Sequence, residues 1–306
     1  MDYLLFAFGL LLLVGGGELL VQSGIALAHK LRLSPLIIGI LLMGIGTSLP
    51  ELSASLSAIL SNPPAPDIAF GNVIGSNISN ILFILGLAAL IHPIRINKEN
   101  FRRDGLFILL SAMMLGVIMA FGYLDSIIGV FLLLSITGYF MICYDKQEED
   151  EATKAKTHVK LKKSAAWLAF FAILGIAGIV WGADLLVDTA SKIANTFGIP
   201  KSVIGLTLIA FGTSLPEVTV SVVAAIHRQS AIAFGNVVGS NIANIFLIVG
   251  SMGIVRAVDV PKMWTSYSIM AFVTVLLLIC GIWGKIPRWM GGVFLIAYGG
   301  YVYYLF

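Results

Sequence analysis

Charged residues are scarce in this sequence. Only 11% of its 306 residues are Asp, Glu, Lys or Arg, whereas 58% are hydrophobic. An ordinary soluble domain carries about 25% charged residues, so a soluble fold of this length would have too little polar surface to cover its core. Cysteine is scarce as well: Cys143 and Cys280 lie far apart in apolar stretches. Two isolated thiols exclude a disulfide framework and a cysteine-based zinc motif.

Long apolar segments fill most of the chain. A helix needs about 20 apolar residues to cross the hydrocarbon region of a bilayer, whereas a membrane strand needs only about 10. The alternation of polar and apolar residues that is typical of a β-barrel is absent. We therefore predict an all-α integral membrane protein with about ten transmembrane helices. The predicted spans cover residues 3–26, 36–60, 68–91, 105–122, 126–144, 165–187, 202–226, 232–254, 264–282 and 289–306.

Basic residues are unevenly distributed over the loops between these spans. If the N-terminus lies outside the cytoplasm, 15 of the 19 basic residues fall on the inner side. Cytoplasmic loops of membrane proteins carry an excess of Lys and Arg. We therefore expect a multi-pass protein of the cell membrane with both termini on the non-cytoplasmic side. The basic residues left on the outer side are Lys192, Lys201, Arg256 and Lys262.

The chain contains an internal repeat. Residues 46–51 (GTSLPE) recur identically as residues 212–217, and residues 69–78 (AFGNVIGSNI) recur as residues 233–242 with one substitution. An odd number of helices in each repeat makes the second repeat enter the membrane from the opposite side. Many secondary transporters share this inverted topology, and their substrate sites lie at the repeat interface near the midplane. The predicted divisions are a first five-helix repeat (1–144), a cytoplasmic linker loop (145–164) and a second five-helix repeat (165–306).

Two glutamates lie deep within apolar spans. Glu51 and Glu217 occupy equivalent positions in the two repeats, and a buried carboxylate in a membrane span marks a functional site. Inverted repeats should bring the two carboxylates together, where they repel each other unless cations or protons lie between them. Pro50 and Pro216 precede them and disfavour a regular helix there, which frees backbone carbonyls for a ligand.

The Thr and Ser residues three and four positions before each glutamate share its helix face and offer further oxygen ligands. The second repeated motif adds a Ser and an Asn that are four residues apart and therefore also share a face. Together they form an all-oxygen set, which hard cations such as Ca²⁺ take as ligands. The motifs contain no His or Cys, so zinc and copper are excluded. The predicted donors beside Glu51 and Glu217 are Thr47, Ser48, Ser76 and Asn80 in the first repeat and Thr213, Ser214, Ser240 and Asn244 in the second.

At these motifs the chain resembles the cation/Ca²⁺ exchanger superfamily, and most closely its prokaryotic Na⁺/Ca²⁺ exchangers. The resemblance rests on GTSLPE followed by GNVIGSNISN in the first repeat and GTSLPE followed by GNVVGSNIAN in the second. It implies that Glu51 and Glu217 are the chief Ca²⁺ ligands and that the other donors complete Ca²⁺ and Na⁺ sites. It also implies that the backbone of Gly44 and Ala210 contributes, although Gly44 stands where the family often has alanine.

The resemblance implies a secondary active antiporter that exchanges Na⁺ for Ca²⁺ by alternating access. Asn244 stands where K⁺-dependent relatives and some prokaryotic members carry Asp, which indicates K⁺-independent exchange. The resemblance also suggests three Na⁺ for each Ca²⁺, so we expect each cycle to carry one net charge and the exchange to be electrogenic. The implied partners are Ca²⁺, Na⁺ and the lipid bilayer. We expect no cofactor, no nucleic acid, no obligate protein partner and no enzymatic activity.

The residues leave three other functions open. A Ca²⁺/H⁺ exchanger of the same superfamily would also use paired buried glutamates. A channel is compatible with the composition. An intramembrane enzyme would need a Ser–His pair, paired aspartates or a zinc motif, and the four histidines all fall at span ends or in loops.

A third symmetric acidic pair, Glu18 and Asp184, either lines the ion path or bonds structural neighbours.

Overall fold

The structure is a computed structural model that describes residues 2–31, 33–145, 164–197 and 212–305. The predicted all-α membrane architecture is confirmed. Eight described helical segments are long and apolar enough to cross a membrane. The described part of the seventh predicted span is a shorter apolar helix, Leu215–Ile226, and an 18-residue helix, Arg288–Leu305, forms the tenth.

Where both halves are described, they contain the same succession of elements. The first half contains α1 (Asp2–Leu31), α2 (Pro35–Ile38), η1 (Gly39–Gly44), α3 (Ile45–Thr47), α4 (Leu49–Leu60), α5 (Pro66–Ser79), η2 (Asn80–Ile84), α6 (Leu85–Ile91), β1 (Ile94–Arg95), α7 (Lys98–Phe121), β2 (Tyr123–Leu124) and α8 (Ser126–Asp145). The second half contains α9 (Ala165–Thr196), α12 (Leu215–Ile226), α13 (Ser230–Ala243), η5 (Asn244–Val249), α14 (Gly250–Val255), β3 (Val258–Asp259), α15 (Trp264–Trp283), β4 (Lys285–Ile286) and α16 (Arg288–Leu305).

Two short sheets show that the halves are inverted relative to each other. Strand β1 pairs with β4, and β2 pairs with β3, both antiparallel. Counted by order in each half, β1 corresponds to β3 and β2 to β4, so equivalent strands belong to different sheets. Strands β1 and β2 flank α7, whose 24 residues span about 36 Å. Equivalent strands therefore lie at opposite ends of the molecule. Sequence analysis did not predict these two-residue strands.

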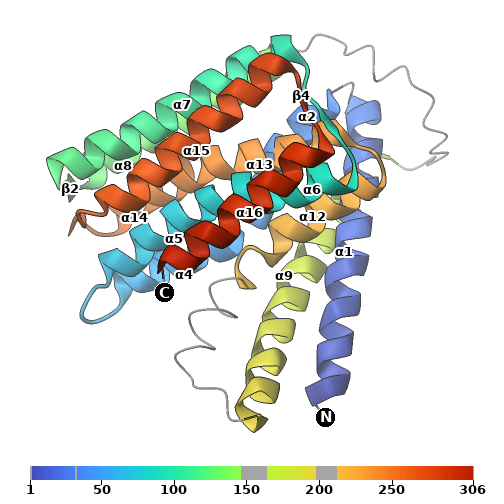
Figure 1. Cartoon of the computed structure of the whole chain (residues 1–306), viewed down its shortest axis with the longest axis horizontal. Helices are drawn as coiled ribbons and strands as arrows, with labels where there is room; N and C mark the ends of the chain where they lie inside the picture. Colours follow the sequence, from blue (N-terminus) through green and yellow to red (C-terminus); the bar gives the residue numbers. More distant parts are fainter. Residues whose placement is uncertain (1, 32, 146–163, 198–211, 306) are drawn as a thin grey trace.

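Helices α1 and α9 form a pair that stands at a steep angle to the other helices (Figure 1). Small residues allow the two backbones to touch. A Cβ atom added at Gly16 would lie 2.8 Å from the carbonyl oxygen of Gly175, and one added at Gly175 would lie 2.9 Å from the carbonyl oxygen of Gly16. Such small residues at helix crossings are typical of membrane helices, where close packing replaces the hydrophobic effect.

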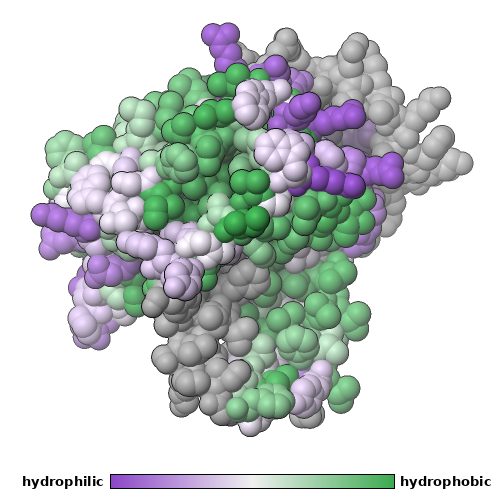
Figure 2. Space-filling model, in the orientation of Figure 1, coloured by the Kyte–Doolittle hydropathy of each residue, from purple (hydrophilic) through white to green (hydrophobic). Residues whose placement is uncertain are grey.

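The surface separates hydrophobic from hydrophilic residues. Figure 2 shows a broad hydrophobic region across the core and hydrophilic residues gathered at its ends. Large apolar side chains such as Ile127, Leu134 and Ile296 are exposed. An exposed apolar area of this extent is expected where lipid, and not water, surrounds the protein.

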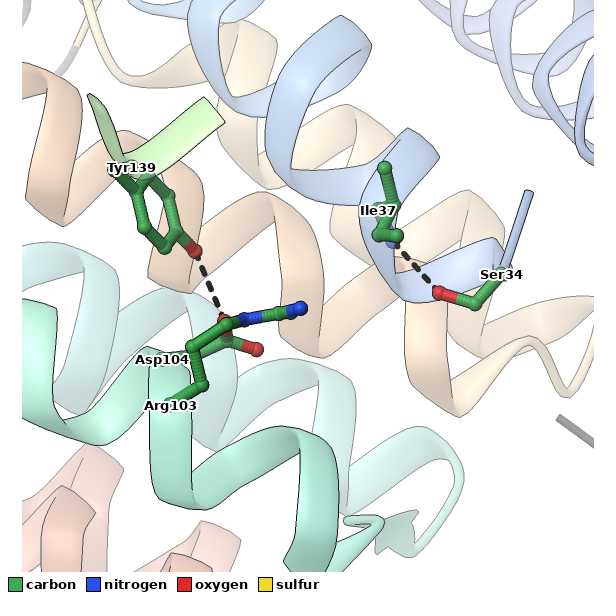
Figure 3. A network of polar contacts seen from close by, with 5 residues as sticks. All are labelled: Ser34, Ile37, Arg103, Asp104 and Tyr139. Atoms are coloured by element: carbon green, nitrogen blue, oxygen red, sulfur yellow. Dashed lines mark hydrogen bonds and ion pairs between the residues drawn. The ribbon is translucent and has the colours of Figure 1, made fainter. Parts of the chain in front are cut away.

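A buried polar cluster joins the start of α7 to the end of α8 (Figure 3). Arg103 Nε lies 2.7 Å from Asp104 Oδ1, and the Tyr139 hydroxyl donates to the same oxygen at 3.2 Å. The predicted span starts at residue 105, whereas the apolar span of the structure starts at Phe101 and α7 itself begins at Lys98. Two adjacent opposite charges are typical of a loop, but here they neutralise each other inside the helix. Elsewhere in Figure 3, the Ser34 hydroxyl accepts a hydrogen bond from the Ile37 amide and caps α2.

Candidate cation site

The repeated GTSLPE motif breaks the helix in each half. In the first half α3 ends at Thr47 and α4 starts at Leu49, because Ser48 leaves the helical region with φ −81° and ψ 6°. In the second half Ser214 shows almost the same angles, φ −88° and ψ 0°, immediately before α12. Each break places a glutamate in the first turn of a new helix, where the amide dipoles favour negative charge.

The two glutamates are buried and are contacted from the opposite half. Glu51 is 2% exposed and Glu217 is 1% exposed. The Ser48 hydroxyl donates to Glu217 Oε1 at 3.2 Å, and the Ser214 hydroxyl donates to Glu51 Oε1 at 3.4 Å. Because Ser48 lies three residues before Glu51, this exchange of contacts brings both carboxylates to the interface of the repeats.

Hydroxyl groups of α3, of Ser48 and of α13 donate to backbone carbonyls of η1. The Gly44 carbonyl oxygen lies 2.8 Å from the Ser48 hydroxyl and 3.1 Å from the Ser240 hydroxyl. The Thr47 hydroxyl lies 2.9 Å from the Met43 carbonyl oxygen. A Cβ atom at Gly44 would lie 2.8 Å from the Cα of Gly239. The close approach of η1 and α13 therefore accounts for glycine where the family often has alanine.

Four buried oxygens in this region have no hydrogen-bond donor among the described residues. They are Glu51 Oε2, Glu217 Oε2, Asn80 Oδ1 and Asn244 Oδ1. A buried acceptor without a donor costs about 1–3 kcal/mol, and more when it is charged. All four atoms are acceptors, so the group that satisfies them must be positively charged or must donate hydrogen. Ca²⁺ and Na⁺ bind oxygens of this kind.

The two asparagines with a free oxygen each mark a change in helix geometry. Asn80 begins η2 and Asn244 begins η5, both π-helical segments. π-Helical turns often occur at functional sites because the wider turn changes the direction of side chains. The Asn80 amide donates to Asn241 Oδ1 at 2.9 Å, which leaves the Asn80 oxygen free.

Sequence analysis missed a second pair of asparagines. The Asn72 amide donates to the Glu51 carbonyl oxygen at 3.1 Å and to the Ser55 hydroxyl at 2.9 Å. The Asn236 amide makes the same contacts with the Glu217 carbonyl oxygen, at 3.2 Å, and with Ser221, at 2.9 Å. Both asparagines lie in the repeated AFGN motifs, so the repeat itself was a signal for them. They hold the backbone of the glutamates.

The remaining predicted residues differ in their positions. Ser76 is buried on α5, whereas Thr213 is only half-buried. Ala210 lies outside the described residues. Glu18 lies away from the glutamate pair: it accepts a hydrogen bond from Gln22 at 3.1 Å and lies 2.8 Å from His227 Nε2. Asp184 is exposed.

Comparison with known proteins identifies relatives along the whole chain. The family model described as "Sodium/calcium exchanger protein" matches residues 1–144 and 167–306. The sodium/calcium exchanger MaX1 of Methanosarcina acetivorans is 34% identical, over 100% of this chain and 98% of the relative. The inner membrane protein YrbG of Escherichia coli is 35% identical, over 98% of this chain and 94% of the relative.

Solved structures give the same result. The sodium–calcium exchanger NCX_Mj, soaked without Na⁺ and Ca²⁺, superposes with a TM-score of 0.85 at 35% identity, over 100% of this chain and 99% of that one. The same exchanger soaked with 2.5 mM Na⁺ and 0.1 mM Ca²⁺ gives a TM-score of 0.82, over 97% of this chain and 96% of that one. The resemblance noted on the repeated motifs is thereby confirmed.

Proposed function

This chain belongs to the sodium/calcium exchanger family, and from that premise we propose that it is a secondary active antiporter that exchanges Na⁺ for Ca²⁺ across the cell membrane. One observation carries this proposal: four buried oxygens that have no donor among the described residues, two of them from carboxylates, lie on equivalent residues of the two halves. Two of the relatives, MaX1 and NCX_Mj, are named as sodium/calcium exchangers, which further supports a transporter and not an enzyme.

The charges of the site set the ion balance. Glu51 and Glu217 bring two negative charges, which one Ca²⁺ neutralises. Na⁺ carries half that charge, so at least two Na⁺ are required, and the hydroxyl and amide oxygens offer ligands for a third. The proposed ligands comprise Thr47, Ser48, Ser76, Asn80, Thr213, Ser214, Ser240 and Asn244, together with the backbone of Gly44 and Ala210.

Alternating access follows from the same charges. A loaded site is close to neutral and is tolerated within the bilayer, whereas an empty site holds two uncompensated carboxylates. The protein therefore changes between inward-facing and outward-facing states only when ions are bound. The α1–α9 pair supports such a movement, because these helices pack mainly on each other and less on the remaining helices.

Topology and ion selectivity complete the proposal. The divisions 1–144, 145–164 and 165–306 are retained, with the linker in the cytoplasm and both termini outside. The amide of Asn244, in place of the carboxylate of K⁺-dependent relatives, removes one negative charge and supports exchange without K⁺. With three Na⁺ for each Ca²⁺, every cycle moves one net charge.

Ion flux into proteoliposomes tests the proposal. An outward Na⁺ gradient should drive uptake of ⁴⁵Ca²⁺, and adding K⁺ should change nothing. If the cycle moves one charge, uptake should respond to a clamped membrane potential with about 2.3 kcal/mol per 100 mV. Uptake driven by a pH gradient in the absence of Na⁺ would instead assign the protein to the Ca²⁺/H⁺ exchangers.

A further inference from the structure

An open cavity of about 600 Å³ lies away from the cation site. The end of α6, the end of α12 and the start of α16 form its walls, so it lies at one end of the helical core. Arg228, Arg288 and His92 line it together with apolar residues, among them Ile91 and Ile226. We refer to this cavity as the arginine pocket.

No described carboxylate neutralises the positive charge of the arginine pocket. Among the side chains that the structure describes, no carboxylate forms an ion pair with Arg95, Arg228 or Arg288. Partial burial lowers the pKa of His92, and the nearby charges of Arg228, Arg288 and Arg95 lower that pKa further. His92 lies just beyond the span that ends at Ile91. The pocket therefore favours an anion.

The backbone at Arg228 supports a specific role for its side chain. Arg228 has φ 57°, in the left-handed region, directly after the end of α12. Glycine is usual at this position after a helix because it adopts such angles without strain. An arginine there keeps a guanidinium at the mouth of the pocket at the expense of backbone strain. Arg288 is fixed by its Nη2 group, which donates to the Ile91 carbonyl oxygen at 3.0 Å.

The rim of the arginine pocket is apolar and continues onto the lipid-facing surface. Ile226 is 61% exposed, and Trp289, beside Arg288, is 66% exposed. Tryptophan is enriched where membrane proteins meet the interface between lipid and water. Figure 2 shows hydrophilic residues bordering hydrophobic ones at the end of the core near β4. A ligand here contacts guanidinium groups and apolar side chains at once.

We propose that the arginine pocket binds the phosphate group of an anionic membrane lipid. Arg228 and Arg288 contact the phosphate oxygens, since guanidinium groups match phosphate in shape and charge. The acyl chains of the lipid lie along Ile226 and the exposed Leu90. Free phosphate would satisfy the arginines but would leave this apolar rim unused.

The position of the pocket suggests how a bound lipid acts on transport. Helix α12 carries Glu217 at its first turn, and α6 continues from η2, which begins at Asn80. Arg228 follows α12, and Arg288, the first residue of α16, donates to the last residue of α6. A lipid bound by both arginines therefore connects the end of α12 with the end of the η2–α6 segment, and both segments begin at the cation site. This consequence rests on the proposed exchange function, whereas the binding itself does not.

Lipid binding is measured on the purified full-length protein by native mass spectrometry, with phosphatidylglycerol and phosphatidylcholine as probes. The test variant is R228G/R288Q, in which glycine suits the left-handed angle and protects the fold. We expect phosphatidylglycerol to be retained about thirtyfold less well, because each arginine near an anionic membrane surface contributes a factor of about five. The matched control is K98Q/R102Q, which loses two exposed charges of α7 outside the pocket.

Equal losses in the test variant and the control would overturn the proposal, because general surface charge would then explain binding. Displacement of the lipid by millimolar inorganic phosphate would assign the pocket to a soluble anion instead. A chain with Glu148, Glu149, Asp150 and Glu151 changed to their amides provides one further comparison. If this linker variant retained more lipid than the unmodified protein, and did so only when Arg228 and Arg288 were present, the acidic linker would be the native occupant of the pocket. That result would also overturn the proposal.

Discussion

Two groups of buried carboxylates in this protein are neutralised in different ways. Asp104, at the start of α7, is fully buried but lies beside the guanidinium of Arg103 and accepts a hydrogen bond from Tyr139. Glu51 and Glu217 are equally buried, but serine hydroxyls are the donors that reach their carboxylate oxygens among the described side chains. The first group contains its own cation, although Asp104 Oδ2 has no hydrogen-bond donor among the described residues, whereas no described cationic side chain pairs with the second.

The presence or absence of a paired cationic side chain distinguishes a structural carboxylate from a functional one better than its degree of burial does. A buried ion pair is a weak source of stability, but removal of one partner leaves an uncompensated charge. A buried carboxylate pair without a cation is unfavourable until an ion arrives. Substitutions at the two places should therefore have opposite effects on transport and on folding.

Replacement of Glu51 or Glu217 by Gln should have the largest effect on transport. Each change removes one of two charges that face a divalent ion, at an expected loss of about 3 kcal/mol or more. The initial rate of Na⁺-driven ⁴⁵Ca²⁺ uptake should fall at least about 100-fold. The thermal midpoint in detergent should stay or rise, because a neutral amide is easier to bury. Near-normal uptake by Glu51→Gln would remove the basis for the cation site.

Replacement of Asp104 by Asn should have the reverse effect. The change leaves Arg103 without its partner, and we expect about 2 kcal/mol of destabilisation. This is less than for a fully buried pair, because Arg103 keeps 13% of its surface exposed. Thermal unfolding measures the loss, and R103Q/D104N should recover most of it. A change in the Ca²⁺ dependence of uptake in the folded variant would contradict a purely structural role.

Replacement of Asn236 by Ala should affect transport to an intermediate degree. Asn236 bonds the Glu217 carbonyl oxygen and Ser221 and does not neutralise charge. Loss of these two hydrogen bonds, and of a third that Asn236 Oδ1 accepts from the Thr47 hydroxyl at 3.3 Å, should reduce Ca²⁺ uptake about tenfold at subsaturating Ca²⁺. Asn72→Ala is the twin variant and should behave alike if the halves are equivalent. Asn77→Ala serves as the control, since the Asn77 amide bonds Val73 of its own helix; an equal loss there would argue against a positioning role.

The same contrast explains which features were visible in the sequence. Glu51 and Glu217 interrupt apolar runs at duplicated positions, so their burial and their meeting at the repeat interface could be predicted from two motifs. The helix breaks were predictable too, because Pro50 and Pro216 act through local backbone chemistry. These features depend on neighbours within a few residues.

Other features depend on contacts between distant segments and could not be predicted. The pair Arg103–Asp104 has the charge pattern of a loop, and only the packing of Tyr139 from α8 shows that α7 already includes it. Glycine at position 44 is explained by the approach of Gly239, almost 200 residues away. The four strands have only two residues each, so they are too short to leave an alternating pattern in the sequence.

The arginine pocket contains unpaired positive charges among its described residues, in contrast to the negative charges of the glutamate pair. The smallest predicted effect concerns His92 in this pocket. The pKa of His92 is lowered by partial burial and by Arg228, Arg288 and Arg95. The folded protein therefore binds a proton on His92 less readily than the unfolded chain does. The free energy of unfolding should decrease as the pH falls below the ordinary histidine pKa of about 6.5. Arg228→Gly should raise the His92 pKa because one neighbouring positive charge is removed, and bound phosphatidylglycerol should raise it in the unmodified protein. Histidine-labelled protein in lipid nanodiscs allows the imidazole ¹⁵N shifts to be titrated, and His92→Gln identifies the His92 signal among those of the four histidines. An His92 pKa that responds to neither change would mean that the arginine charges do not act on this pocket.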